Sequence, residues 1–327
     1  LRYRGSNSTS QNHIRLFQIT RETTISFGDS SASDNDQSDS SPSPSPSISL
    51  LAGLDDTIEK VQSLLLTPLV HPELFQSNPS LRPPKGVLLY GSSGAGKSTL
   101  ASQVAQTLQR SHNVHIHELS CAKLQSQTSL VGQAERALVR AFESASQQSN
   151  AAASLIVLDD VHLICPRRQG MNIGADRLAA TLLALLDGVE TPNKKEQPQQ
   201  QQKKPLVMVL AVTNNPSLLD PALRRPGRLD TEVEVPLPDE PWTRSLILQF
   251  HLQRLGVQVS IVHDKADEWI RLARLAKGFT GADLQLAVKE AIRLSILRKN
   301  KAQQSTTGDS PIIVETNDLE SAIRSIK

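Results

Sequence analysis

The eight residues GSSGAGKS, at positions 91–98, constrain the fold of this chain more than any other part of its sequence. They fit the pattern G-x-x-x-x-G-K-[ST], and they lie between an apolar run at 86–90 and a helical pattern that begins at Lys97. Glycines let a backbone approach an anion closely, and the amide groups at a helix N-terminus can then bind it. The segment therefore predicts a strand, a phosphate-binding loop and a helix in succession.

The segments that follow alternate short apolar runs with helical patterns, which is typical of a parallel sheet with crossover helices. Strands are expected at residues 86–90, 114–118, 155–158, 206–212 and 232–235. Helices are expected between them at residues 97–110, 135–146 and 177–186. We expect an α/β domain of the P-loop NTPase type over residues 50–237, with a five-stranded parallel sheet.

After Pro236 the strand patterns stop, and the sequence predicts a small all-helical lid domain at 238–327. Its helices are expected at residues 242–255, 266–277, 282–298 and 317–326. The Ser/Pro-rich residues 1–49 are expected to form a disordered linker, with the remnant of an upstream domain at 14–27. Residues 191–205 contain a glutamine run, which predicts a flexible insertion.

The composition disfavours two classes of function. The chain has 35 basic and 33 acidic side chains and only 3% aromatic residues, so it offers neither the positive field nor the stacking surface of a nucleic-acid binder. No apolar stretch is long enough for a membrane span, and two cysteines form no disulfide framework. We expect a soluble protein of the cytoplasm, with the nucleus as the alternative. Because the sequence begins at Leu1, we also expect that it starts inside a longer product.

Two acidic residues end the apolar run at 155–158, and a phosphate-loop ATPase requires such a second element. Asp159 is expected to bind Mg²⁺ together with Ser98, and Asp160 is placed to act as general base for the attacking water. Lys97 is expected to bind the β and γ phosphates of ATP. Without the phosphate loop, two acids after a strand would more often be the start of a solvated loop.

Four further segments carry a resemblance to a known family. They are HPELF at 71–75, RPPKGVLLYG at 82–91, AVTNNPSLLDPALRRPGRLD at 211–230 and GFTGADL at 278–284. Together with the two motifs above they resemble the classical AAA ATPases, over residues 51–327. The likeness is greatest to the first ATPase domain of valosin-containing-protein-like double-ring segregases. CPRR at 165–168 resembles the ribosome-maturation, spermatogenesis-associated subgroup.

The resemblance implies a homo-hexameric ring that remodels a polypeptide or pre-ribosomal substrate. It implies that Asn214 is a sensor of the γ-phosphate, that Arg225 and Arg228 are arginine fingers acting in trans, and that Asp187-Gly188 is an inter-subunit signalling element. Leu130 and Val131 match the substrate-gripping pore loop, where the family has an aromatic residue. The implied nucleotide-binding residues are Ala52, Gly53, Ser93, Gly94, Ala95, Gly96, Lys97, Ser98, Thr99, His251, Gly281 and Ala282.

Two departures from the family pattern leave a second hypothesis open. Asp160 stands where the family usually has Glu, and Leu130 offers less contact area than an aromatic residue. Both favour a nucleotide-binding structural ring module with slow or no hydrolysis. The first hypothesis is the ring ATPase described above, in which the shorter acid lowers the rate of ATP hydrolysis. A third hypothesis, nucleic-acid remodelling, has no support in the composition. The histidines His112, His115 and His117 are better explained as part of a surface strand than as metal ligands.

Overall fold

A computed structural model describes residues 51–71, 84–126, 132–147, 153–167, 173–188, 206–256, 258–260, 266–302 and 313–327. All of them belong to one compact unit, Ile48–Lys327. The predictions made for residues 1–49 and 191–205, and for Leu130 and Val131, lie outside the described residues. Within the described residues, no helix has both the length and the apolar character that crossing a membrane requires.

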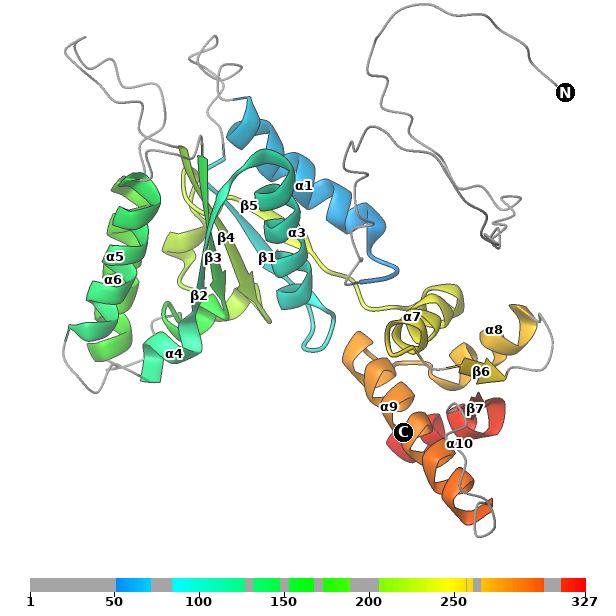
Figure 1. Cartoon of the computed structure of the whole chain (residues 1–327). Helices are drawn as coiled ribbons and strands as arrows, with labels where there is room; N and C mark the ends of the chain where they lie inside the picture. Colours follow the sequence, from blue (N-terminus) through cyan, green and yellow to red (C-terminus); the bar gives the residue numbers. More distant parts are fainter. Residues whose placement is uncertain are drawn as a thin grey trace, which may run out of the picture. The chain divides into compact units, whose positions relative to one another are not determined.

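Five parallel strands form the central sheet, in the order β2-β3-β4-β1-β5 (Figure 1). Their bounds are β1 Gly86–Tyr90, β2 His115–Ser120, β3 Ala153–Asp159, β4 Leu206–Thr213 and β5 Thr231–Glu234. The three inner strands are apolar and almost fully buried, as expected of a sheet covered on both faces. This confirms the predicted fold class.

Helices cover both faces of the sheet (Figure 1). On one face, α1 (Asp55–Val70) and α3 (Lys97–His112) pack on alternate side chains such as Leu89, Leu155 and Leu210. On the other face, α5 (Gln133–Gln147) and α6 (Ile173–Gly188) pack on the intervening ones. Successive side chains of a strand point to opposite faces, so each strand contributes to both cores.

The carboxyl ends of β1, β3 and β4 lie at the same edge of the sheet, because the strands are parallel and adjacent. Tyr90 pairs with Thr213, and Leu158 pairs with Ala211. This edge therefore carries three parts of the predicted site: the phosphate loop after β1, Asp159 at the end of β3 and Asn214 after β4. Ligands of open α/β sheets bind outside this edge. Short elements also follow it: α4 (Cys121–Ser126) and the 3₁₀ turns η2 (Val161–Leu163), η3 (Pro216–Leu218) and η4 (Pro221–Arg224).

The second lobe contains the expected helices but is not all-helical. Its helices are α7 (Pro241–Arg254), α8 (Ala266–Leu275), α9 (Gly281–Ala302) and α10 (Thr316–Ile326), and they share one apolar core. Two short strands, β6 (Gln258–Ser260) and β7 (Ile313–Glu315), form a parallel pair beside them. The prediction that strands end after Pro236 was wrong, because three residues are too few to show a two-residue period.

Candidate nucleotide-binding site

Two glycines give the loop between β1 and α3 its shape. Gly94 has φ 78° and Gly96 has φ 95°, a left-handed region that side chains rarely adopt. A Cβ atom on Gly94 would lie 2.6 Å from Thr280 Oγ1, so the loop also passes too close to the second lobe for a larger residue. From Gly96 the chain turns directly into α3, whose first amide groups face the loop. Such a turn is suited to hold a phosphate chain.

Lys97 places a buried cation inside this loop. The residue is 5% exposed, and its Nζ donates a hydrogen bond of 2.7 Å to Ser92 O. Burial lowers the pKa of Lys97, and the nearby carboxylates of Asp160 and Asp159 act in the opposite direction. A buried ammonium is stabilised by an anion that enters the loop, as the phosphates of a nucleotide would.

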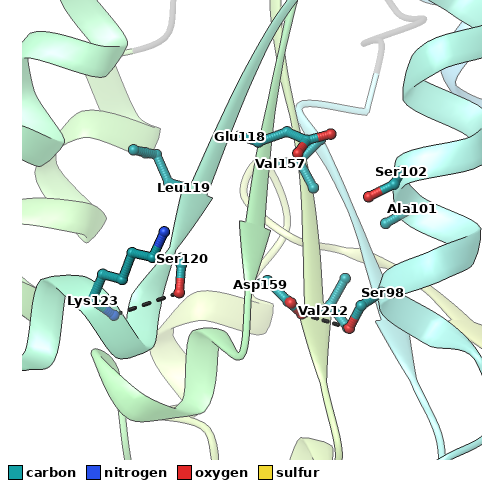
Figure 2. Close-up of a pocket in the computed structure, with 10 residues that line it drawn as sticks. All are labelled: Ser98, Ala101, Ser102, Glu118, Leu119, Ser120, Lys123, Val157, Asp159 and Val212. Atoms are coloured by element: carbon teal, nitrogen blue, oxygen red, sulfur yellow. Dashed lines mark hydrogen bonds between the residues drawn. The ribbon is translucent and has the colours of Figure 1, made fainter.

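Ser98, in the first turn of α3, and Asp159, at the end of β3, lie side by side next to the loop. Figure 2 shows the two side chains joined by a hydrogen bond. Ser98 Oγ donates a hydrogen bond of 2.9 Å to Asp159 Oδ1. The contact is at the edge of a hollow of about 200 Å³, whose wall also contains Ser120 and Lys123. A hydroxyl and a carboxylate side by side are the oxygen donors that Mg²⁺ prefers, so these residues fit a Mg²⁺ ion.

Asp160 has an unusual backbone. It has φ 56° and ψ 48°, the left-handed region, which Asp tolerates better than most residues. Its side chain is 41% exposed. The turn separates it from Asp159, which remains in the strand.

The buried thiol of Cys121 lies near both acids. Burial, with a smaller effect of Asp159 and Asp160, raises the pKa of Cys121 to about 12. This thiol therefore stays protonated at neutral pH.

Most of the predicted site residues line one cavity of about 610 Å³. This volume is within the range of small-molecule sites in proteins. All of the residues that the resemblance assigns to nucleotide binding line the cavity, and so do Asp160 and Asn214. These fourteen residues come from the segment before α1, the phosphate loop, the ends of β3 and β4, and the second lobe. Asp159 lines the adjoining hollow and is joined to the cavity through Ser98.

Residues of the second lobe complete the lining of the cavity. His251 lies there with Phe250, and the two rings meet edge to face with centroids 5.5 Å apart. The pKa of His251 is lowered by burial first, and then by Arg254 and Lys289. Sequence reasoning did not identify Phe250, Arg254 or Gln285, which also line the cavity. Arg254 is three residues after His251 on the same helix, and this spacing was the available signal.

The second lobe also bonds to the phosphate loop itself. The backbone N–H of Ala282 donates a hydrogen bond of 3.1 Å to Gly94 O. A Cβ atom on Gly281 would lie 3.2 Å from the same oxygen, so the small residues here permit the contact. Thr280 and Asp283 cap the start of α9 through reciprocal hydrogen bonds. The N-terminus of α9 is thus held against the loop.

The two predicted arginine fingers lie outside the cavity and differ from each other. Arg228 Nε and Nη2 each donate a hydrogen bond of 2.7 Å to Asp187, and its Nη1 donates one of 2.6 Å to Ala222 O. The pKa of Asp187 is lowered mainly by this bond to Arg228. Arg225 is exposed, and within the described part of the chain it forms no ion pair. Only Arg225 is therefore free to reach another molecule without breaking an internal contact.

The histidines of β2 are separate from the cavity. The rings of His115 and His117 have centroids 4.5 Å apart. Among the described residues, His115 Nδ1 and His117 Nε2 find no hydrogen-bond partner, and no group of three His, Cys, Asp or Glu side chains is arranged to hold a metal ion.

The fold and the loop geometry define a P-loop nucleoside-triphosphate-binding protein. Residues 87–237 match the family described as "ATPase family associated with various cellular activities (AAA)". The chain therefore contains an AAA ATPase domain, as the sequence motifs predicted. Such a domain implies binding of ATP.

Several curated proteins are similar to the chain over most of its length. It is 35% identical over 249 residues to "Cell division cycle protein 48 homolog" of Archaeoglobus fulgidus, which covers 76% of this chain and 30% of that protein. It is 32% identical over 279 residues to "ATPase family gene 2 protein" of Saccharomyces cerevisiae, covering 85% and 32%. It is 34% identical over 271 residues to "ATPase family gene 2 protein homolog B" of Mus musculus, covering 83% and 32%. The chain spans about a third of the length of these relatives.

Proposed function

We propose that this chain is a Mg²⁺- and ATP-dependent ATPase subunit of a homo-hexameric ring that remodels or unfolds protein or ribonucleoprotein substrates. The observation that supports it best is the single cavity in which Lys97, Asp160 and Asn214 meet. A buried cation for the terminal phosphates, a candidate base and a candidate sensor amide are the groups that ATP hydrolysis needs. The similarity to the cell division cycle protein 48 homolog and to the ATPase family gene 2 proteins adds support.

In the proposed reaction, Lys97 and the loop amides hold the β and γ phosphates of ATP, and Asp160 accepts a proton from the attacking water. Asn214 orients this water beside the γ-phosphate. Ser98 and Asp159 would hold Mg²⁺, which would neutralise charge on the phosphate oxygens. Arg225 stabilises the transition-state charge in the site of the neighbouring subunit. A polypeptide or pre-ribosomal particle is the proposed substrate, in the cytoplasm or the nucleus, with no membrane and no direct nucleic-acid contact.

The proposed nucleotide site is tested by Lys97→Ala. We expect ATP affinity to fall by at least about a hundredfold, because charge-assisted hydrogen bonds to the phosphates are lost and each is strong. Fluorescent-nucleotide titration measures the affinity, and the exposed Lys60 on α1 provides a matched control, Lys60→Ala, with unchanged affinity. If Lys97→Ala binds ATP as the native chain does, residues 91–98 are not the phosphate site.

A second candidate function is a ring module that binds ATP for assembly and hydrolyses it slowly. Asp160 favours it, because its carboxylate is one methylene closer to the backbone than that of Glu and is less able to reach a water molecule. Under this candidate, ATP promotes assembly, which analytical ultracentrifugation measures, while Asp160→Asn leaves the residual turnover unchanged. A drop in turnover for Asp160→Asn excludes it.

A further inference from the structure

We propose that His162 is a positioning residue that holds the Asp160 carboxylate in place and links it to the end of β4. This role rests on the proposed function, in which Asp160 is the general base. His162 carries no signal of its own in the sequence. The structure places it between two groups of the candidate site.

The backbone turn at Asp160 brings the two side chains together. The left-handed conformation of Asp160 starts the 3₁₀ turn η2, and Leu163 N donates a hydrogen bond of 2.9 Å to Asp160 O. As a result, His162 Nδ1 lies 4.0 Å from Asp160 Oδ1. The histidine side chain is 17% exposed and that of Asp160 is 41% exposed. The imidazole is thus the more fixed of the two, as a support must be.

The other neighbour of the imidazole is Thr213, the last residue of β4. Thr213 is fully buried, and its Oγ1 lies 3.4 Å from His162 Nδ1. The Thr213 hydroxyl donates its only proton to Asn215 O, at 3.3 Å, and accepts the Asn215 N–H, at 3.4 Å. A hydroxyl has one donor and two acceptor positions, so the remaining position accepts from His162. This arrangement of the hydroxyl corresponds to the tautomer of His162 that has its proton on Nδ1.

This tautomer directs the Nδ1–H to the Thr213 hydroxyl, while Asp160 Oδ1 lies 4.0 Å from Nδ1, a distance for electrostatic attraction and not for a hydrogen bond. Thr213 is bonded directly to Asn214, the candidate sensor that lines the same cavity as Asp160. Through His162, the candidate base and the candidate sensor are held by one chain of polar contacts. A carboxylate on a short side chain has little freedom to adjust, and errors of about 1 Å in an active site can cost on the order of a hundredfold in rate. His162 sets the orientation from which the short acid acts.

The experiment compares His162→Asn with His162→Gln. Asn places an amide N–H close to the position of Nδ1, whereas Gln places it close to Nε2, on the far side of the ring. We expect His162→Gln to lower kcat about tenfold, the effect of one weakened hydrogen bond, with the KM for ATP unchanged. His162→Asn should restore most of this loss. Thr213→Val should lower kcat too, and combining it with His162→Gln should add little, because both changes break the same link.

The controls separate this proposal from the proposed function. His112→Gln, on the exposed end of α3, tests whether loss of any histidine affects the rate. If the native chain hydrolyses ATP, Asp160→Asn does not, and His162→Gln matches the native kcat, then the role of His162 is excluded and the proposed function stands. Equal losses in His162→Asn and His162→Gln also exclude it. A native chain without turnover overturns both.

Discussion

The position after β3 is unusual both in its residue and in its backbone. Asp160 is a short acid, and its φ of 56° is one of two positive values found for residues other than glycine among the described residues. Asp and Asn enter this region more readily than Glu. The sequence shows the short side chain but not the turned backbone, so it cannot decide how far the carboxylate reaches. A series of substitutions at Asp160 can measure whether its carboxylate reaches the attacking water.

At residue 160 we expect Asp160→Asn to lower the turnover of ATP on the order of a hundredfold, because the amide cannot accept the proton of water. Asn also tolerates the left-handed backbone, so the fold should not change. Asp160→Glu should raise turnover with little effect on ATP affinity, since the longer side chain extends the reach of the base. Steady-state ATPase assays at saturating ATP measure both. A lower rate for Asp160→Glu would show that the turned backbone already brings Asp160 into reach.

Which residues line the cavity was largely predictable from the sequence, and the contacts between them were not. A glycine pattern and a lysine identify the phosphate loop because spacing along the chain is what the loop requires. The bond from Arg228 to Asp187 joins residues 41 positions apart. His162 and Thr213 are likewise distant in sequence, and neither residue type indicates the contact. Such pairs depend on how the elements pack, which no local pattern records.

Among the elements, β2 is an edge strand with two neighbouring histidines. Burial, and to a smaller extent His115, lowers the pKa of His117. Because the folded state resists protonation, stability is greatest above the unfolded pKa, near 6.5, and falls as the pH drops from there to the lower folded value. Among the described residues His117 Nε2 has no hydrogen-bond partner, which agrees with a neutral ring. Acidification should therefore destabilise the large domain through this strand.

For β2 we expect His117→Phe to reduce the loss of thermal stability between pH 7.5 and pH 5.5. Phenylalanine keeps a ring of similar shape without a titrating nitrogen. The melting temperature of the variant should fall less than that of the native chain, by roughly 2 °C. Circular dichroism melts at both pH values give this difference. An equal fall in the two proteins would show that other groups carry the acid sensitivity.

The sequence predicted long elements better than short ones. The apolar runs of β1, β3 and β4 are buried on both faces, and this leaves a clear composition signal. No helix was predicted at α1, which contains Pro68 within its last turn. The strands β6 and β7 pair only with each other across a long stretch of sequence. This pairing joins segments more than fifty residues apart, so no local sequence pattern indicates it.

At the scale of the whole molecule, neither of the two proposed arginine fingers lines the cavity formed by the described residues. Arg225 and Arg228 do not line the cavity, and Arg228 is held by Asp187 at the end of α6. If the proposed ring forms, the two arginines should contribute differently. Arg225 is available to a neighbour, whereas Arg228 supports the segment that presents it.

We expect Arg225→Ala to lower ATP turnover on the order of a thousandfold, as loss of an arginine finger does, without changing the melting temperature. Arg228→Ala should lower the melting temperature by about 2–4 °C, because it removes an ion pair and a backbone hydrogen bond. Calorimetry and ATPase assays separate the two. In mixtures with the native chain, Arg225→Ala should reduce turnover more steeply than its share of subunits. A proportional decrease would argue against action in trans.

The hydrogen bond from Ala282 N to Gly94 O joins the phosphate loop to the first turn of the longest helix described. Helix α9 has 22 residues, a rod of about 33 Å at 1.5 Å per residue. A rotation of about 10° at its glycine end would move the far end of such a rod by about 6 Å. A small displacement of the loop carbonyl would thus become a much larger displacement at the far end of α9.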